Sequence, residues 1–178
     1  MGRGGLMTHI MRVDAGKLIE KAADALKTEG SVEATEWAQF VKTGHHKERL
    51  PDNPDWWFVR SAAILRSVAA TGPIGTQKLR HKFGGKKNRG HKPGHFYKAS
   101  GSIIRKILQQ LEKSGLISQT QKGSFKGRIL TPKGTSFLDK IAVGIYKESR
   151  PAKTKAAAPK KEAPKAEEKP EASEKTQE

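Results

Sequence analysis

The stretch Trp56–Ala70 constrains the fold of this chain more than any other part of the sequence. It reads WWFVRSAAILRSVAA, and apolar side chains occupy most of its circumference when it is drawn as a helix. A helix that is apolar nearly all round has to be buried on nearly all sides. We therefore predict that this stretch forms the central helix of the core, that Gly72 and Pro73 end it, and that the other elements pack around it.

The residues before this helix predict a long helix, a short helix and a connector. Asp14 can cap a helix that runs to about Glu29 and stops at Gly30, because Asp accepts hydrogen bonds from a first turn and Gly suits the residue after a last turn. A shorter helix is expected near Ala34–Lys42. The segment His45–Asp55 contains two prolines and is expected to be irregular.

The residues after the core helix follow the order of a winged helix. Thr76–Phe83 predicts a short helix, and an amphipathic pattern over about Ser102–Ser114, capped by Ser100, predicts a longer one. Leu116–Thr120 and Arg128–Leu130 predict two strands joined as a hairpin. In winged-helix domains the third helix is presented to nucleic acid and the hairpin is the wing. The predicted fold class is therefore mainly α, a winged-helix-type helical domain with a small β-hairpin.

The two ends of the chain differ from its centre. After Ser149 the sequence consists mainly of Ala, Pro, Lys, Glu and Thr, which cannot bury enough surface to offset the entropy of ordering. At the other end, Met7 and Met11 follow Met1 closely, so that the true start is left open. The predicted organisation is an N-terminal extension (residues 1–12), a folded domain of winged-helix type (13–148) and a disordered C-terminal tail (149–178).

Acidic and basic residues are distributed unevenly along the chain. From Trp56 to Leu111 the chain has no Asp or Glu but twelve Lys and Arg residues, and the whole chain has a formal net charge of +17. A solvated surface normally mixes both signs, because a field of one sign repels itself. A folded segment that omits acids over this length is suited to a polyanion, and nucleic acid is the first candidate.

The candidate contacts lie on three parts of this acid-free stretch. Arg105, Lys106 and Gln109 occupy the face of the third helix opposite its apolar stripe. Gly84–Gly94 reads GGKKNRGHKPG and predicts a glycine-rich basic loop, either a mobile surface loop or one that orders on RNA. Arg60 lies among the aromatic residues of the core helix, where it pairs with phosphate or stacks internally. The residues predicted to bind RNA are Arg60, Lys78, Arg80, Lys82, Lys86, Lys87, Arg89, Lys92, Lys98, Arg105, Lys106 and Gln109.

Several other classes of function find no support in the residues. The chain has no Cys, and Pro93 and Gly94 separate His91 from His95, so neither a metal site nor another cofactor is predicted. Hydrolase motifs are absent and the basic region offers no carboxylate as general base, so we predict neither an enzyme nor a small-molecule substrate. No apolar run approaches the roughly 20 residues of a membrane span, so no membrane partner is predicted.

Three long motifs have counterparts in a known family. They are DWWFVRSAAIL at Asp55–Leu65, YKASGSIIRKILQQL at Tyr97–Leu111 and GRILTPKG at Gly127–Gly134. With them the chain, over about residues 14–142, resembles the archaeal and eukaryotic small-subunit ribosomal protein S19e family. The resemblance implies a winged-helix-type domain that binds rRNA in the head of the small subunit, contributes to maturation of that subunit and contacts neighbouring small-subunit ribosomal proteins in the cytoplasm. It also implies that Arg60, the basic loop and the third helix face RNA, and that Trp37 is structural.

Two functions of other classes remain as alternatives. A DNA-binding winged-helix regulator would need a dimer and base-reading side chains in the third helix. A chaperone or assembly partner of an acidic protein would use the basic surface and the tail. No dimer-forming heptad stands out, and the positive charge extends well beyond one helix, which favours RNA.

Overall fold

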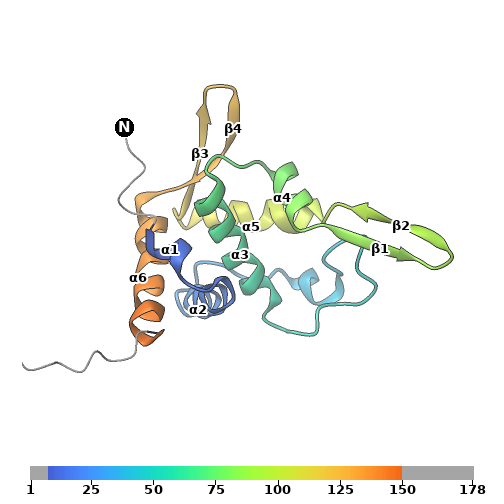
Figure 1. The fold of residues 1–178 in the computed structure, drawn as a ribbon, viewed down its shortest axis with the longest axis horizontal. Coiled ribbons are helices and arrows are strands. Elements are labelled where there is room, and N and C mark those ends of the chain that lie inside the picture. Colours follow the sequence, from blue (N-terminus) through green and yellow to red (C-terminus); the bar gives the residue numbers. More distant parts are fainter. Residues whose placement is uncertain (1–7, 150–178) are drawn as a thin grey trace, which may run out of the picture.

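The computed structural model describes residues 8–149, which form a mainly helical body with two projecting β-hairpins (Figure 1). The predicted mainly α fold class is thus confirmed, with one hairpin more than expected. The predicted disordered tail lies outside the described residues, apart from the last residue of α6. In chain order the elements are α1 (Thr8–Arg12), α2 (Ala15–Thr28), the 3-10 helix η1 (Glu36–Phe40), α3 (Trp56–Thr71), α4 (Thr76–Lys82), β1 (Gly85–Arg89), β2 (Lys92–Tyr97), α5 (Gly101–Lys113), β3 (Ile117–Lys122), β4 (Phe125–Leu130) and α6 (Pro132–Ser149).

Helix α3 is the centre of the core, as the sequence predicts. The side chains of Trp57, Ile64 and Leu65 are fully buried, and Val68 is nearly so. Helices α2 and α5 and strand β4 all contact α3, which lies in the middle of the body in Figure 1. Because each buried side chain of this size contributes roughly 1.5–3 kcal/mol, this helix holds the other elements in place.

The N-terminal part confirms the predicted cap and adds a short helix. The backbone N–H of Lys17 donates to Oδ2 of Asp14 over 3.1 Å, and Gly30 has a φ of 61° just after α2. Residues 8–12, which the sequence assigns to an extension, form α1 against α6. Ile10 is 1% exposed, so the folded body starts before residue 13.

The short helix expected near residues 34–42 is a 3-10 turn rather than an α-helix. Its N-cap residue, Thr35, makes no side-chain cap bond, and the element covers only five residues. Trp37 packs edge-to-face on Trp57 with 5.6 Å between ring centroids. Short segments held by a tertiary contact commonly adopt this tighter turn. The structural role expected for Trp37 agrees with this contact.

Helices α3, α4 and α5 and the β3–β4 hairpin occur in winged-helix order. Ile74, between α3 and α4, exchanges two backbone hydrogen bonds with Arg128 of β4, of 3.2 and 3.0 Å. These bonds attach the β3–β4 hairpin to the helical body. Ser100 occupies the N-cap position of α5 as predicted, but its side chain makes no cap bond; its backbone N–H donates to the carbonyl of Thr43.

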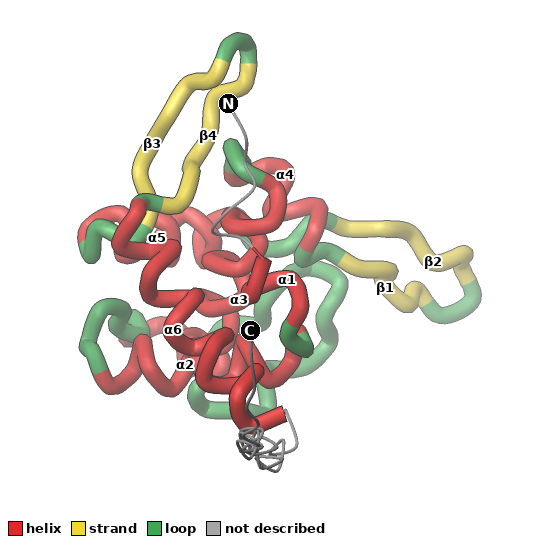
Figure 2. Tube along the Cα trace, turned by 60° about the vertical axis from the view of Figure 1, so that its left-hand side comes forward, coloured by secondary structure: helices red, strands yellow, loops and turns green. Residues whose placement is uncertain are grey.

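The prediction of a glycine-rich loop over residues 84–94 is wrong, because this segment belongs to a second hairpin. Strand β1 pairs antiparallel with β2, with Gly85 opposite Tyr97 and Lys87 opposite His95. The Asn88 side chain accepts a 3.0 Å bond from the backbone N–H of Gly90, whose φ is 67°. Both hairpins project from the helical body, and in different directions (Figure 2). The backbone ladder forms without the apolar alternation that marks a half-buried strand.

Candidate nucleic-acid interface

The candidate interface is a basic face formed by α4, the β1–β2 hairpin and the outward side of α5. In the chain, the hairpin is inserted between α4 and α5, the second and third helices of the winged-helix order. Two bonds close its base: the backbone N–H of Ala99 donates to the carbonyl of Arg80 over 2.9 Å, and Nε of Arg80 donates to the carbonyl of Ala99 over 3.1 Å. The hairpin therefore leaves the body from a fixed position.

The outward side of α5 carries the polar residues that the sequence places there. Arg105, Lys106 and Gln109 are exposed. On the opposite side of the same helix, Ile103, Ile104, Ile107, Leu108 and Leu111 are at most 2% exposed. Because this stripe is packed into the core, the outward side chains start from a rigid backbone.

Arg80 and Arg105 converge beside the first residue of α5. A Cβ atom placed on Gly101 would lie 3.0 Å from Nη1 of Arg105 and 3.3 Å from Nε of Arg80. Arg80 also donates to the Gln77 side chain over 3.2 Å. Two guanidinium groups at a helix N-terminus, where backbone N–H groups also face outward, make a favourable place for an anion.

Most of the remaining predicted residues are exposed cations on α4, on the β1–β2 hairpin or just after it. The exposed ones are Lys78 and Lys82 on α4, Lys86, Arg89 and Lys92 on the hairpin, and Lys98 just after it. Among residues 8–149, no carboxylate forms an ion pair with any of these cations, or with Arg60, Arg80, Lys87, Arg105 or Lys106. Their charge is therefore not neutralised within the described part of the chain.

Lys87 is only half-buried but has partners inside the protein. Its Nζ lies 3.2 Å from Nε2 of His45 and 5.8 Å from the centre of the Tyr97 ring. His45 and Tyr97 also pack edge-to-face at 4.7 Å. Lys87 thus joins the hairpin to the connector that precedes α3, in addition to adding charge to the basic face.

The sequence leaves open whether Arg60 pairs with phosphate or stacks inside the protein, and the structure shows it stacked on an aromatic ring. Its guanidinium lies over the ring of Phe83, 4.7 Å from the ring centre, and burial lowers the pKa of Arg60. An arginine remains charged under all ordinary conditions, so this is a partly desolvated cation held against an aromatic face. Arg60 therefore lies at the junction of α3 with the end of α4.

A neighbouring histidine belongs to the same junction. Burial, the charge of Lys47 and the charge of Arg60, in that order of importance, lower the pKa of His46. The His46 ring also covers the start of the hairpin, since a Cβ on Gly85 would lie 2.9 Å from its Cδ2 atom. The His46 ring thus fills the space beside the base of the β1–β2 hairpin.

Sequence reasoning missed two features of the basic surface. Phe96 of β2 is 49% exposed, and its ring lies 4.6 Å from that of His81 on α4. An aromatic pair beside exposed cations offers a stacking surface for bases. The aromatic residues between Lys92 and Lys98, in the segment KPGHFYK, are the signal that could have shown it. The second feature is the tip of the β3–β4 hairpin, where Lys126 is exposed.

Other basic residues beyond the acid-free stretch are engaged in the fold. Arg128 donates to both carboxylate oxygens of Glu112, over 2.9 and 3.4 Å, and both side chains are about one-fifth exposed. Lys133 donates to the carbonyl of Ser114 at the end of α5 over 3.0 Å. These two cations stabilise the wing and a helix end, so they are less available to an external anion.

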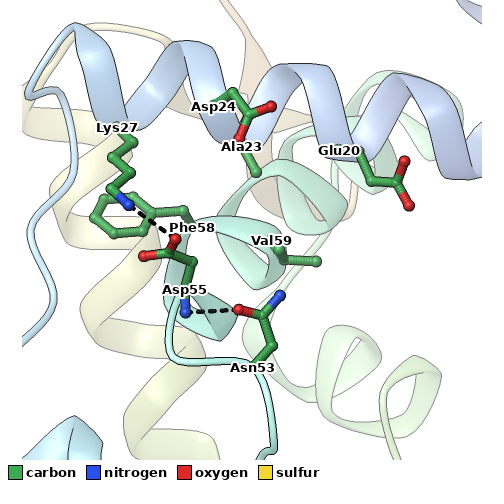
Figure 3. Close-up of a pocket in the computed structure, with 8 residues that line it drawn as sticks. All are labelled: Glu20, Ala23, Asp24, Lys27, Asn53, Asp55, Phe58 and Val59. Atoms are coloured by element: carbon green, nitrogen blue, oxygen red, sulfur yellow. Dashed lines mark hydrogen bonds and ion pairs between the residues drawn. The ribbon is translucent and has the colours of Figure 1, made fainter.

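A pocket of about 230 Å³ lies on a different surface, between α2 and the start of α3 (Figure 3). Lys27 pairs with Asp55 over 2.8 Å at its rim, and the Asn53 side chain accepts a 2.8 Å bond from the backbone N–H of Asp55. Three carboxylates oppose one lysine, so this pocket does not suit a polyanion. Its lining residues are Glu20, Ala23, Asp24, Lys27, Asn53, Asp55, Phe58 and Val59.

Two other kinds of site are absent from the described residues. Residues 8–149 contain no group of three or more His, Asp or Glu side chains placed to hold a metal ion. No helix in this part of the chain combines the length and the apolar character of a membrane span.

Comparison with known proteins identifies the family. The family model for ribosomal protein S19e matches residues 9–148 of this chain. The chain belongs to the S19e family. The match contains every helix and strand from α2 to β4, and most of α1 and α6, so both hairpins lie within the S19e region.

Individual S19e relatives cover most of the chain. It is 45% identical over 144 residues to small ribosomal subunit protein eS19 of Aeropyrum pernix, which covers 80% of this chain and 92% of the relative. Identity is 41% over 143 residues with eS19G of Ascaris suum, covering 80% and 95%, and 43% over 141 residues with eS19 of Entamoeba histolytica, covering 79% and 88%. The predicted family is confirmed.

Membership has direct consequences for the class of function. The chain is a ribosomal protein, a structural and non-enzymatic component of the cytoplasmic ribosome. The alternatives of a DNA-binding regulator and of a chaperone for an acidic protein have no support from these S19e relatives.

Proposed function

We propose that this S19e family member binds small-subunit rRNA through its basic face, in the head of the subunit. The observation that carries the proposal is the convergence of Arg80 and Arg105 at the N-terminus of α5, within a field of cations that have no ion-pair partner among residues 8–149. The resemblance of the chain to small-subunit relatives supports the same partner.

The two parts of the basic face would hold RNA in different ways. The α5 side is rigid, because its apolar stripe is packed into the core, and it presents Arg105 and Lys106 at fixed spacing. The β1–β2 hairpin projects from the body (Figure 2). Its cations Lys86, Arg89 and Lys92 are exposed. Since double-stranded RNA is recognised mainly through its shape and backbone, the two surfaces together would grip a folded segment. Phosphate contacts would supply most of the affinity.

Neighbouring small-subunit ribosomal proteins are the proposed protein partners. The acidic pocket between α2 and α3 has the opposite charge to the basic face, so RNA would not cover it. This leaves one surface of the domain available to a protein. A role in maturation of the small subunit follows if rRNA segments depend on the domain to keep their arrangement during assembly.

The salt dependence of binding to deproteinised small-subunit rRNA tests the proposal. If about six phosphates are neutralised, the slope of log K against log salt should be about −4 to −5. Arg105→Ala with Lys106→Ala should weaken binding and make the slope less steep by about 1.5 to 2. Lys17→Ala with Lys21→Ala removes the same charge from α2 and is the matched control. Binding that does not respond to salt or to the first double variant would overturn the proposal.

Sedimentation tests the place of the protein in the ribosome. The chain should be recovered with small subunits when a lysate is fractionated on a sucrose gradient. Nuclease treatment of those fractions should release it, because the proposed attachment is to RNA. Recovery in an RNA-free complex would contradict rRNA as the main partner.

A further inference from the structure

The β3–β4 hairpin carries an aromatic side chain that the proposed interface does not use. Phe125 starts β4 beside the turn at Gly123, whose φ is 62°, and it is 71% exposed. Figures 1 and 2 show this hairpin projecting from the helical body. A phenylalanine left in water at the end of an arm forgoes the burial that most large apolar side chains obtain.

The arm itself is held firmly at its base. Strands β3 and β4 pair in unbroken register from Ile117 opposite Leu130 to Lys122 opposite Phe125. Arg128 binds Glu112 of α5 with two hydrogen bonds, and it exchanges two backbone bonds with Ile74. Phe125 is therefore displayed at a set position relative to α5, the rigid part of the basic face.

The residues around Phe125 indicate what it meets. The outer half of the hairpin, residues 119–127, reads QTQKGSFKG, so that Phe125 is its only apolar side chain. Lys126 beside it is exposed, and the hairpin contains no Asp or Glu. A protein-docking arm would be expected to present several apolar residues as a patch. A single aromatic ring among amides, glycines and cations is instead typical of surfaces that stack on single-stranded nucleic acid.

We propose that Phe125 stacks on an unpaired base of small-subunit rRNA, with Lys126 adding phosphate contact at the tip. This inference rests on the proposed rRNA-binding function and extends it to a second contact outside the α4–α5 face. RNA loops and bulges expose bases that stack on Phe, and such stacking is tolerant of sequence. The wing would thus bind a single-stranded segment while α5 and the β1–β2 hairpin hold a folded one.

Substitutions at position 125 test the stacking contact. Phe125→Ala should weaken binding to deproteinised small-subunit rRNA by about 5- to 100-fold. Phe125→Trp should retain the affinity, whereas Phe125→Leu, which is apolar but not aromatic, should not restore it. The salt slope should stay unchanged, because no charge is removed. The thermal midpoint of unfolding should also stay unchanged, because the side chain is mostly exposed.

The same assay separates this inference from the proposed function. Weaker binding by Arg105→Ala with Lys106→Ala, but normal binding by Phe125→Ala, would overturn the stacking contact and leave the basic face in place. Normal binding by all variants would overturn both. If Phe125→Ala reduces incorporation into whole subunits but not binding to naked rRNA, and Phe125→Leu restores it, the ring occupies an apolar pocket of a protein and the inference is wrong.

Discussion

Arg80 and Ala99 are joined by two hydrogen bonds across the base of the β1–β2 hairpin. The Arg80 carbonyl accepts from the Ala99 backbone N–H, and the Arg80 side chain donates back to the Ala99 carbonyl. Because the Arg80 side chain also lies beside Gly101, next to Nη1 of Arg105, one residue both closes the inserted hairpin and adds charge to the proposed interface. Stability and RNA affinity should therefore respond together at this position.

Arg80→Lys separates these two roles. The variant keeps the charge but lacks the planar Nε donor, so the free energy of unfolding should fall by about 1 kcal/mol while rRNA affinity falls less than in Arg80→Ala. Urea denaturation and filter binding measure the two effects. Lys140→Arg, an exposed substitution on α6, is the control and should change neither quantity. Equal stability of Arg80→Lys and the unaltered protein would contradict the closing role.

Glu112→Gln should destabilise the attachment of the β3–β4 hairpin. It weakens the paired hydrogen bonds to Arg128 at a site that is about one-fifth exposed, so we expect a loss of about 1–3 kcal/mol in the free energy of unfolding. Glu148→Gln breaks the exposed pair with Lys21 and should cost less than about 1 kcal/mol. Denaturant titration of both variants checks the comparison. Equal losses would show that burial does not strengthen the Arg128 pair.

Arg60 and Phe83 should be coupled energetically. The guanidinium packs on the ring at 4.7 Å, so Arg60→Ala should lower the free energy of unfolding by about 2 kcal/mol, and Phe83→Leu should lower it as well. In a double-mutant cycle the two losses should not add, with a coupling of about 0.5–2 kcal/mol. Additive losses would mean that the stacking contributes nothing and that Arg60 is held by other contacts.

His46 should make stability depend on pH. Its folded pKa is below the ordinary value of 6.5, so the unfolded chain binds a proton more readily than the folded one. The contribution of neutral His46 is fully present above pH 6.5 and is lost as the pH falls from there through the lower folded pKa. In urea denaturation, the free energy of unfolding of His46→Gln should change less between about pH 7.5 and about pH 5 than that of the unaltered protein. These two pH values lie on either side of the ordinary histidine pKa of 6.5. Parallel profiles of the two proteins would assign the pH dependence to other groups.

The elements that the sequence predicts well are those with a local signal. Helix α3 has apolar residues on nearly every side, and α5 has a clear apolar stripe. Asp14 and Gly30 mark the ends of α2 through side-chain and backbone preferences that act within one turn. The β1–β2 hairpin has no such signal. Its strands are largely exposed on both faces, and only the backbone ladder and the contacts at its base hold it.

The candidate interface also has features that the local sequence predicts and others that depend on contacts between elements. The sequence alone predicts which residues are basic and that α5 turns Arg105 and Lys106 outward, because composition and helical spacing are sufficient for both. The sequence could not predict the internal contacts of three other cations, because their partners come from other elements. Arg60 stacks on Phe83, Arg80 binds Ala99 and Lys87 lies beside His45.

The core helix, the helix caps, the excess of positive charge and the family motifs were determined by the sequence itself, because each depends on neighbouring residues or on composition. The tertiary structure alone decided that Arg80 and Arg105 lie together beside Gly101, that residues 85–97 form a hairpin and that Phe125 stands at the end of a fixed arm. These relationships depend on distances between elements, and such distances are set by the packing of α3, α4 and α5 rather than by any local pattern.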